Sequence, residues 1–455
     1  MDSDGLSWRF YPSPESMGEG NVSDPKGPED AVLDDWKLRG DEALLAGDFD
    51  LALEAYFEAL QRTPDDPDAR YNMAVIHLEL GRYNDAITLL KGVLATSPQD
   101  KEALTALGWA QLWVGEARAA VKTFRRVQLA APHYDPALVG LGWAHMVDTP
   151  PVLGRAADAF ARAISLGSQD PEAYFGLAAA CEMRGELTQA VPLLEDALRF
   201  WPEDLRSHES LARVQENLGN WEAAAYHLMQ LAHARPDDTT LDRRIAQLFS
   251  DNGAFDRAAV FWRKVTVQNP EDRSAALSLA DTLLQANQSE AAIAAFKEVQ
   301  EDPNSEVAAL EGLGHAHFLA SRWTDAVDAY LQALKRAPQN TEIICNLGNT
   351  YLEAQEYESA LWAFQKALKL DSSLIDARVG LGWACYHQGR LETARETFEM
   401  ALGQQSHSVN AIDGLASTLW RLGLSDQAIK LLKDSGYCAD PDHPLTVKLS
   451  FLETS

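Results

Sequence analysis

A pattern that returns every 34 residues, shifted once by two residues, is the feature that most restricts how this chain can fold. With Leu33 counted as the first position of the first unit, the eighth position holds only Gly or Ala, and the twentieth holds only Ala, from Ala52 to Ala428. The eighth positions are Gly40, Ala74, Gly108, Gly142, Ala178, Ala212, Ala246, Ala280, Gly314, Gly348, Gly382 and Ala416. The twenty-fourth positions are the large residues Tyr56, Leu90, Phe124, Phe160, Leu194, Leu228, Trp262, Phe296, Tyr330, Phe364, Phe398 and Leu432. A period of this length indicates a solenoid, in which stacked copies of one small unit share a continuous core.

The repeated residues predict two antiparallel helices in each unit. Helices approach closely only where a small side chain meets a bulky one, so the Gly or Ala at position eight is expected to oppose large residues of neighbouring helices. Gly at position fifteen, such as Gly47, is expected to end the first helix. Pro near position thirty-two, such as Pro64, cannot continue a helix and should set the turn into the next unit. An all-α fold follows.

These residues resemble the tetratricopeptide repeat family, whose period and residue spacing they share. The resemblance implies a right-handed α-solenoid of twelve helix-turn-helix units over residues 33–442. Residues 443–455 are similar to half a repeat, with Leu449 at its seventh position, and are expected to form a C-terminal capping helix. Residues 1–32 are rich in Pro, Gly, Ser and acids and are predicted to be a disordered acidic tail. Within it, Trp8-Arg9-Phe10-Tyr11 is unusual, because solvated tails are poor in aromatic clusters.

Charge and cysteine content narrow the classes of partner. A formal net charge of −29 disfavours nucleic acid and anionic membrane surfaces, since both attract basic proteins. Four scattered cysteines are too few for a disulfide framework, and no apolar run is long enough for a membrane span. The acidic start of the chain does not resemble a signal peptide, so a cytoplasmic location is expected.

Motifs that carry chemistry are absent from the sequence. It contains no Gly-rich phosphate loop, no Cys-x-x-Cys and no His-Glu-x-x-His. We therefore expect no catalytic residue, no cofactor and no metal site, and assign the function to protein or peptide binding.

In the family that this chain resembles, the first helix of each unit lines a concave surface. Positions five, nine, twelve and thirteen point toward it, and in units three to five they are apolar. The predicted partner-binding groove consists of Trp109, Trp113, Trp143, Met146 and Phe175. Gly140 and Gly176 at position six are expected to leave the floor of this groove open, with Trp109 and Trp143 facing solvent. A second predicted patch consists of Val379, Trp383, Tyr386 and Trp420, above Gly380 and Gly414.

Three interpretations of these aromatic residues stay open at this stage. They bind a partner, because exposed aromatic surface is costly unless something covers it. Alternatively, they fill gaps between adjacent first helices, or the chain's own Trp8-Arg9-Phe10-Tyr11 segment covers one patch.

Units six and seven carry a polar, locally basic surface. Its basic residues are Arg206, Arg213, Arg243 and Arg244. They form either a solvated face paired with Glu209 and Glu216 or a site for an acidic partner segment. Family members that clamp a carboxylate terminus use Lys, Asn and Arg at set positions. Lys37 and Asn72 match that pattern, whereas Asp41, Glu102 and Ala106 do not, so this type of binding is not expected.

The sequence thus predicts a scaffold or adaptor that holds peptide segments in an apolar groove. The alternatives are a self-associating assembly protein, hence a homo-oligomer, and a chaperone cofactor.

Overall fold

The computed structural model describes residues 28–299, 306–437 and 443–454, and these residues form helices and no strand. Two compact units, Met1–Ala234 and Arg235–Ser455, are each described by themselves. The helices of the first unit are α1 (Pro28–Leu45), α2 (Phe49–Arg62), α3 (Pro67–Glu79), α4 (Tyr83–Thr96), α5 (Lys101–Trp113), α6 (Ala117–Ala130), α7 (Asp135–Val147), α8 (Leu153–Ser165), α9 (Pro171–Met183), α10 (Leu187–Phe200), α11 (Leu205–Asn217) and α12 (Trp221–Ala234). Those of the second unit are α13 (Thr239–Asp251), α14 (Phe255–Gln268), α15 (Arg273–Gln285), α16 (Ser289–Val299), α17 (Glu306–Leu319), α18 (Trp323–Arg336), α19 (Thr341–Glu353), α20 (Tyr357–Leu370), α21 (Ile375–His387), α22 (Leu391–Gln404), α23 (Val409–Arg421), α24 (Ser425–Asp434) and α25 (Pro444–Thr454).

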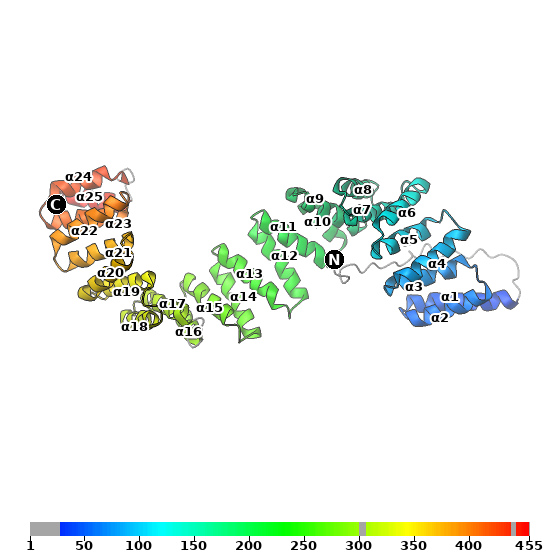
Figure 1. The fold of residues 1–455 in the computed structure, drawn as a ribbon, viewed down its shortest axis with the longest axis horizontal. Helices are drawn as coiled ribbons and strands as arrows, with labels where there is room; N and C mark the ends of the chain where they lie inside the picture. The colour runs from blue at the N-terminus through cyan, green and yellow to red at the C-terminus, as the bar shows by residue number, and fades with distance from the viewer. Residues whose placement is uncertain (1–27, 300–305, 438–442, 455) are drawn as a thin grey trace. The chain divides into compact units, whose positions relative to one another are not determined.

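Within each unit, consecutive helices pair as the repeat predicts. Each odd-numbered helix packs on the next helix, as α7 does on α8, and each even-numbered helix packs on the first helix of the following repeat, as α8 does on α9 (Figure 1). First helices of adjacent repeats also touch, as α5 and α7 do. The predicted all-α solenoid fold is confirmed.

The core of each repeat is built around the large residue at position twenty-four. Phe124 is fully buried, and its ring lies against two glycines. A Cβ atom on Gly108 of the same repeat would lie 2.6 Å from that ring, and a Cβ on Gly140 of the next repeat would lie even closer. The expected small-to-large packing at position eight is therefore confirmed, whereas the expected opening beneath Gly140 is wrong. The same packing recurs at Gly142 and Gly176 around Phe160, and at Gly380, Gly382 and Gly414 around Phe364 and Phe398.

The turn after each first helix requires a residue with a positive φ angle. Gly at position fifteen supplies it in most repeats, for example Gly47 with φ 75°. Where that glycine is missing, Asn287, Ser321 and Gln355 adopt φ angles of 57°, 57° and 63°. The turn geometry is thus imposed by the packing of the helices it joins, even where the residue is unfavourable for it.

Both ends of the repeat array differ from the interior. Helix α1 begins at Pro28, five residues inside the predicted tail of residues 1–32, and the segment Trp8-Arg9-Phe10-Tyr11 lies outside the described residues. Helix α25 occupies most of the predicted capping segment 443–455 and packs on α24. Its side chains Leu445, Leu449 and Leu452 are buried in the same core as Leu432.

Candidate protein-interaction surface

Trp109 on α5 and Trp143 on α7 form the floor of the predicted groove, and both are buried. Their side chains are only 6% and 9% exposed, and Met146 is buried as well. Trp109 meets Phe124 edge-on at a centroid distance of 5.7 Å, and Trp143 meets Phe160 in the same way at 5.6 Å. The prediction that these two tryptophans face solvent is therefore wrong. Residues at position six are too small to keep them away from the phenylalanine rings beneath.

A partly exposed rim lies beside this floor. Trp113 stacks on Trp109 at 5.9 Å and also contacts Tyr83 at 5.2 Å. Phe175 on α9 lies 6.1 Å from Trp143. Both rim rings are half-buried, and Met183 at the end of α9 is 56% exposed. We call the exposed apolar surface of Trp113, Phe175 and Met183, together with the buried Trp109 and Trp143, the aromatic face.

Two buried polar atoms of this region have no hydrogen-bond partner among the described residues: Nε1 of Trp143 and Oε2 of Glu172. Glu172 is only 2% exposed, and its other carboxylate oxygen pairs with Arg206. Burial raises the pKa of Glu172 to about 7, although Arg206 acts in the opposite direction. A buried donor or acceptor without a partner costs about 1–3 kcal/mol, so such atoms mark a place where a ligand atom can be favourable.

The predicted basic patch is internally neutralised where its partners are described. Arg206 pairs with Glu172 and with Asp204, whose Oδ1 lies 3.2 Å from Nε, and its guanidinium lies 4.9 Å from the centre of the Phe175 ring. Arg213 pairs with Glu182 at 2.5 Å. These partners belong to the preceding repeat, which corrects the expected pairing with Glu209 and Glu216 on the same helix.

The other two arginines of that patch lie on α13 in the second unit. Arg243 pairs with Asp272 and lies 5.7 Å from the centre of the Trp262 ring, and Arg244 is half-buried. Because the two units are described separately, the four arginines do not form one described surface.

The second predicted patch has the same layered construction as the aromatic face. Val379 is buried, and Trp383 meets Phe398 edge-on at 5.5 Å. Tyr386 lies 5.5 Å from Trp383 and is covered by the guanidinium of Arg421 at 5.0 Å, while Trp420 stays half-exposed. This patch therefore offers less open apolar surface than residues 113, 175 and 183 do.

Two sequence profiles described as tetratricopeptide repeat match most of the chain. One matches residues 43–107 and 77–142, and the other matches 153–204, 184–239, 243–306, 304–341 and 345–409. The chain is a tetratricopeptide repeat protein. Such proteins are protein-interaction scaffolds. The first and last helix pairs extend beyond the matched residues, so the count of twelve repeats stays a prediction.

Individual relatives of this tetratricopeptide repeat protein are distant or cover little of it. The Hsp70-Hsp90 organising protein of Plasmodium falciparum (isolate 3D7) is 40% identical over 60 residues, which are 13% of this chain and only 11% of that protein. Yeast Tom70 is 16% identical, with 94% of this chain and 96% of that chain covered and a TM-score of 0.38. The type IV pilus biogenesis factor PilW is 20% identical, with 45% and 94% covered and a TM-score of 0.41. The family assignment rests on the sequence profiles.

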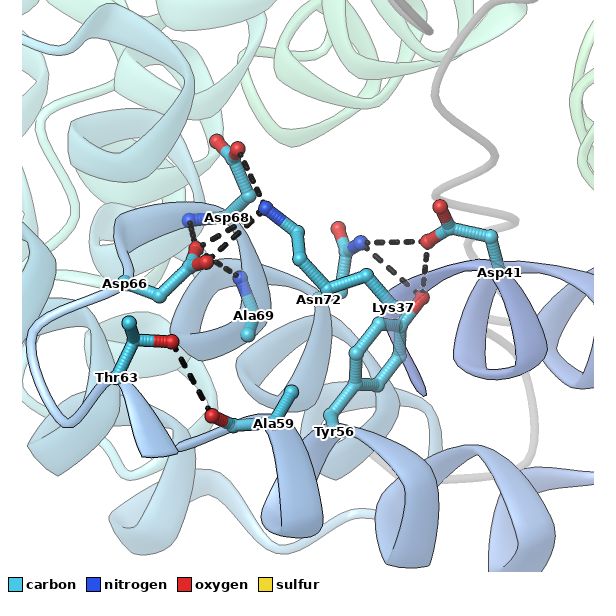
Figure 2. A network of polar contacts seen from close by, with 9 residues as sticks. All are labelled: Lys37, Asp41, Tyr56, Ala59, Thr63, Asp66, Asp68, Ala69 and Asn72. Atoms are coloured by element: carbon cyan, nitrogen blue, oxygen red, sulfur yellow. Dashed lines mark hydrogen bonds and ion pairs between the residues drawn. The ribbon is translucent and has the colours of Figure 1, made fainter. Parts of the chain in front are cut away.

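The first repeat of this tetratricopeptide repeat protein holds the two residues that match the carboxylate clamp (Figure 2). Lys37 Nζ lies 3.0 Å from Asp66 and 3.1 Å from Asp68. Asn72 donates to Asp41 Oδ1 at 3.2 Å and to the Tyr56 hydroxyl at 3.1 Å, and this hydroxyl donates to the same Asp41 oxygen at 2.5 Å. Carboxylates of the chain itself thus engage both residues, which supports the expectation that no carboxylate terminus binds here.

Two structural searches bear on other functions. Across residues 28–299, 306–437 and 443–454, no group of three or more His, Cys, Asp or Glu side chains could hold a metal ion. Within the same ranges, every helix is too short or too polar to cross a membrane.

Proposed function

We propose that this protein is a scaffold or adaptor that binds an extended or helical segment of a partner protein on its aromatic face. The single observation that carries this proposal is the partly exposed rim of Trp113, Phe175 and Met183 beside two buried polar atoms without partners. Aromatic and methionine side chains are the usual anchors of protein interfaces, and exposed apolar patches mark such sites.

A peptide suits this face for chemical reasons. Its apolar side chains would cover the rim, and every residue of its backbone offers both a carbonyl acceptor and an N–H donor. The Trp143 Nε1 group can donate to such a carbonyl, and Glu172 Oε2 can accept from an N–H group. Recognition by these groups requires no catalysis, so we propose a binding protein and not an enzyme. The cytoplasmic location stays a prediction.

Self-association is the second candidate, and the first repeat favours it. Its side chains Leu45, Leu51 and Phe57 are all exposed, and an open pocket lined in part by Trp36 and Ala55 lies beside them. The end repeat of a solenoid needs a polar outer face to stay monomeric. Light scattering tests this candidate, because a dimer would lose mass on dilution and on Phe57→Glu substitution. The third candidate, a chaperone cofactor, has only the 60-residue similarity to the Hsp70-Hsp90 organising protein in its favour.

The proposed peptide binding can be tested without knowledge of the natural partner. A display library of random 12-residue peptides is selected on the full chain, and the affinities of selected peptides are measured for two matched variants. Met183→Glu changes a residue that is 56% exposed on the aromatic face, and Met400→Glu changes one that is 53% exposed on α22. We expect Met183→Glu to weaken binding at least tenfold and Met400→Glu to leave it unchanged. Equal effects of the two substitutions, or no selected peptide, would contradict the proposal.

A further inference from the structure

We propose that the Trp8-Arg9-Phe10-Tyr11 segment of the same chain occupies the aromatic face in the free protein, so that a partner must displace it. This inference rests on the proposed function, because it assigns an occupant to the proposed binding site. It makes the N-terminal segment an internal competitor.

The reach of the chain permits this contact. Helix α1 begins at Pro28, and the segment between Tyr11 and Pro28 can span on the order of 55 Å when extended, at about 3.3 Å per residue. The first helices α3, α5, α7 and α9 contact one another in succession, and neighbouring packed helices lie about 8–10 Å apart. The distance from α1 to α9 is therefore on the order of 40 Å. Both partners also belong to the same compact unit.

The composition of the segment complements the surface. Its three aromatic side chains match the apolar rim of Trp113, Phe175 and Met183. Its arginine lies between two of them and can donate to Glu172 Oε2, the buried acceptor without a partner. The backbone carbonyls of the segment can accept from Trp143 Nε1. An acidic tail offers few such combinations, and this is its one cluster of aromatic residues.

Covalent attachment favours this occupant over a second copy of the chain. A flexible linker of this kind gives an effective concentration in the millimolar range, far above the concentration of free protein in most assays. A segment with a dissociation constant of about 0.1 mM would thus keep the face mostly occupied, while a partner of higher affinity could still replace it.

The test measures whether the segment competes with itself. A fluorescent peptide of residues 4–15 is titrated with the full chain and with a full-length tail variant that carries Trp8→Ala, Phe10→Ala and Tyr11→Ala. We expect the peptide to bind the tail variant at least tenfold more tightly, because the internal competitor is gone. In the tail variant, added Met183→Glu should weaken this binding at least tenfold, and added Met400→Glu should not change it. The peptide with Arg9→Glu should also bind more weakly.

Several outcomes would overturn the inference. Equal affinity for the wild-type chain and the tail variant would show that the segment does not occupy the site. Loss of binding by Met400→Glu as well as by Met183→Glu would show that the contact is not specific to the aromatic face. A wild-type mass above that of the tail variant in light scattering would show that the segment bridges two copies. If library peptides bind in a manner that depends on Met183 while residues 4–15 do not bind, only the self-docking falls and the proposed function stands.

Discussion

The indole ring of Trp143 meets the phenyl ring of Phe160 edge-on, with the centroids 5.6 Å apart and the planes at 78°. The same geometry recurs in Trp109 with Phe124 and in Trp383 with Phe398. In each pair, a tryptophan at position nine covers the phenylalanine at position twenty-four of the same repeat. Such edge-on contacts add about 0.5–1.5 kcal/mol to the free energy gained from burial alone. The tryptophans therefore stabilise the repeat in addition to shaping its surface.

Substitution of Trp143 by Ala is expected to lower the free energy of unfolding by about 3–5 kcal/mol, since it removes a large buried side chain and leaves a cavity. The matched control is Trp362→Ala on α20, because that tryptophan is 51% exposed and its loss should cost about 0.5 kcal/mol or less. Thermal melts of the two variants, with Trp262→Ala as a core reference, make the comparison. If Trp143→Ala melts together with Trp362→Ala, the packing described for Trp143 is incorrect.

Substitution of Gly140 by Ala is expected to destabilise the protein by about 1–3 kcal/mol, because the new methyl group would overlap the ring of Phe124. Gly154 on α8 is the matched control, since nothing lies within 4 Å of a Cβ at that position. There, Ala should be neutral or stabilising by up to about 1 kcal/mol through helix propensity. Thermal melts or chemical denaturation distinguish the two sites. Similar melting temperatures for both variants would refute the close contact.

His227 is expected to make the protein less stable in acid. Its Nδ1 lies 2.9 Å from Nδ1 of His208, and burial, together with His208, lowers the pKa of His227 to about 4. The unfolded chain binds this proton at pH values below about 6.5, before the folded protein does, so stability is full above that value and falls by about 2–3 kcal/mol down to pH 4. Denaturation curves measured between pH 7.5 and 4 test this expectation. His227→Leu should remove most of the slope, whereas His233→Leu, at an exposed position of the same helix, should leave it unchanged.

Glu172 is expected to act in the opposite direction. Burial raises its pKa to about 7, so the folded protein holds this proton more tightly than the unfolded chain does. Its contribution is fully present below pH 4.5 and is lost as the pH rises through 7, by about 1–3 kcal/mol. Asp170, Asp204 and Arg206 face the same carboxyl group.

Glu172→Gln, which resembles the protonated acid, tests this prediction. The variant should match the wild type at pH 4.5 and exceed it in stability at pH 8. Glu209→Gln at an exposed position of α11 serves as the control and should not change the pH dependence. A variant that is less stable than the wild type at pH 8 would show that the ion pair with Arg206 outweighs the burial of the charge.

The sequence determined the helix pairs and the residues at their close contacts. This was possible because every repeat meets the same packing requirement. Phe124 and Phe160 recur at one position, and Gly108 and Gly142 recur at another, so the period by itself shows which side chains must meet. The capping segment followed from the same logic, since half a repeat has a buried face only if it covers the last core.

Only the tertiary structure decided how open the predicted binding surface is. Helical periodicity shows toward which side of its own helix Trp143 points, but not that Phe160 and Phe175 close around it. Arg206 likewise finds Glu172 34 residues away, on a neighbouring repeat. These contacts depend on the distance and rotation between adjacent helices. Those quantities arise when side chains of two repeats pack together, so no single repeat of the sequence contains them.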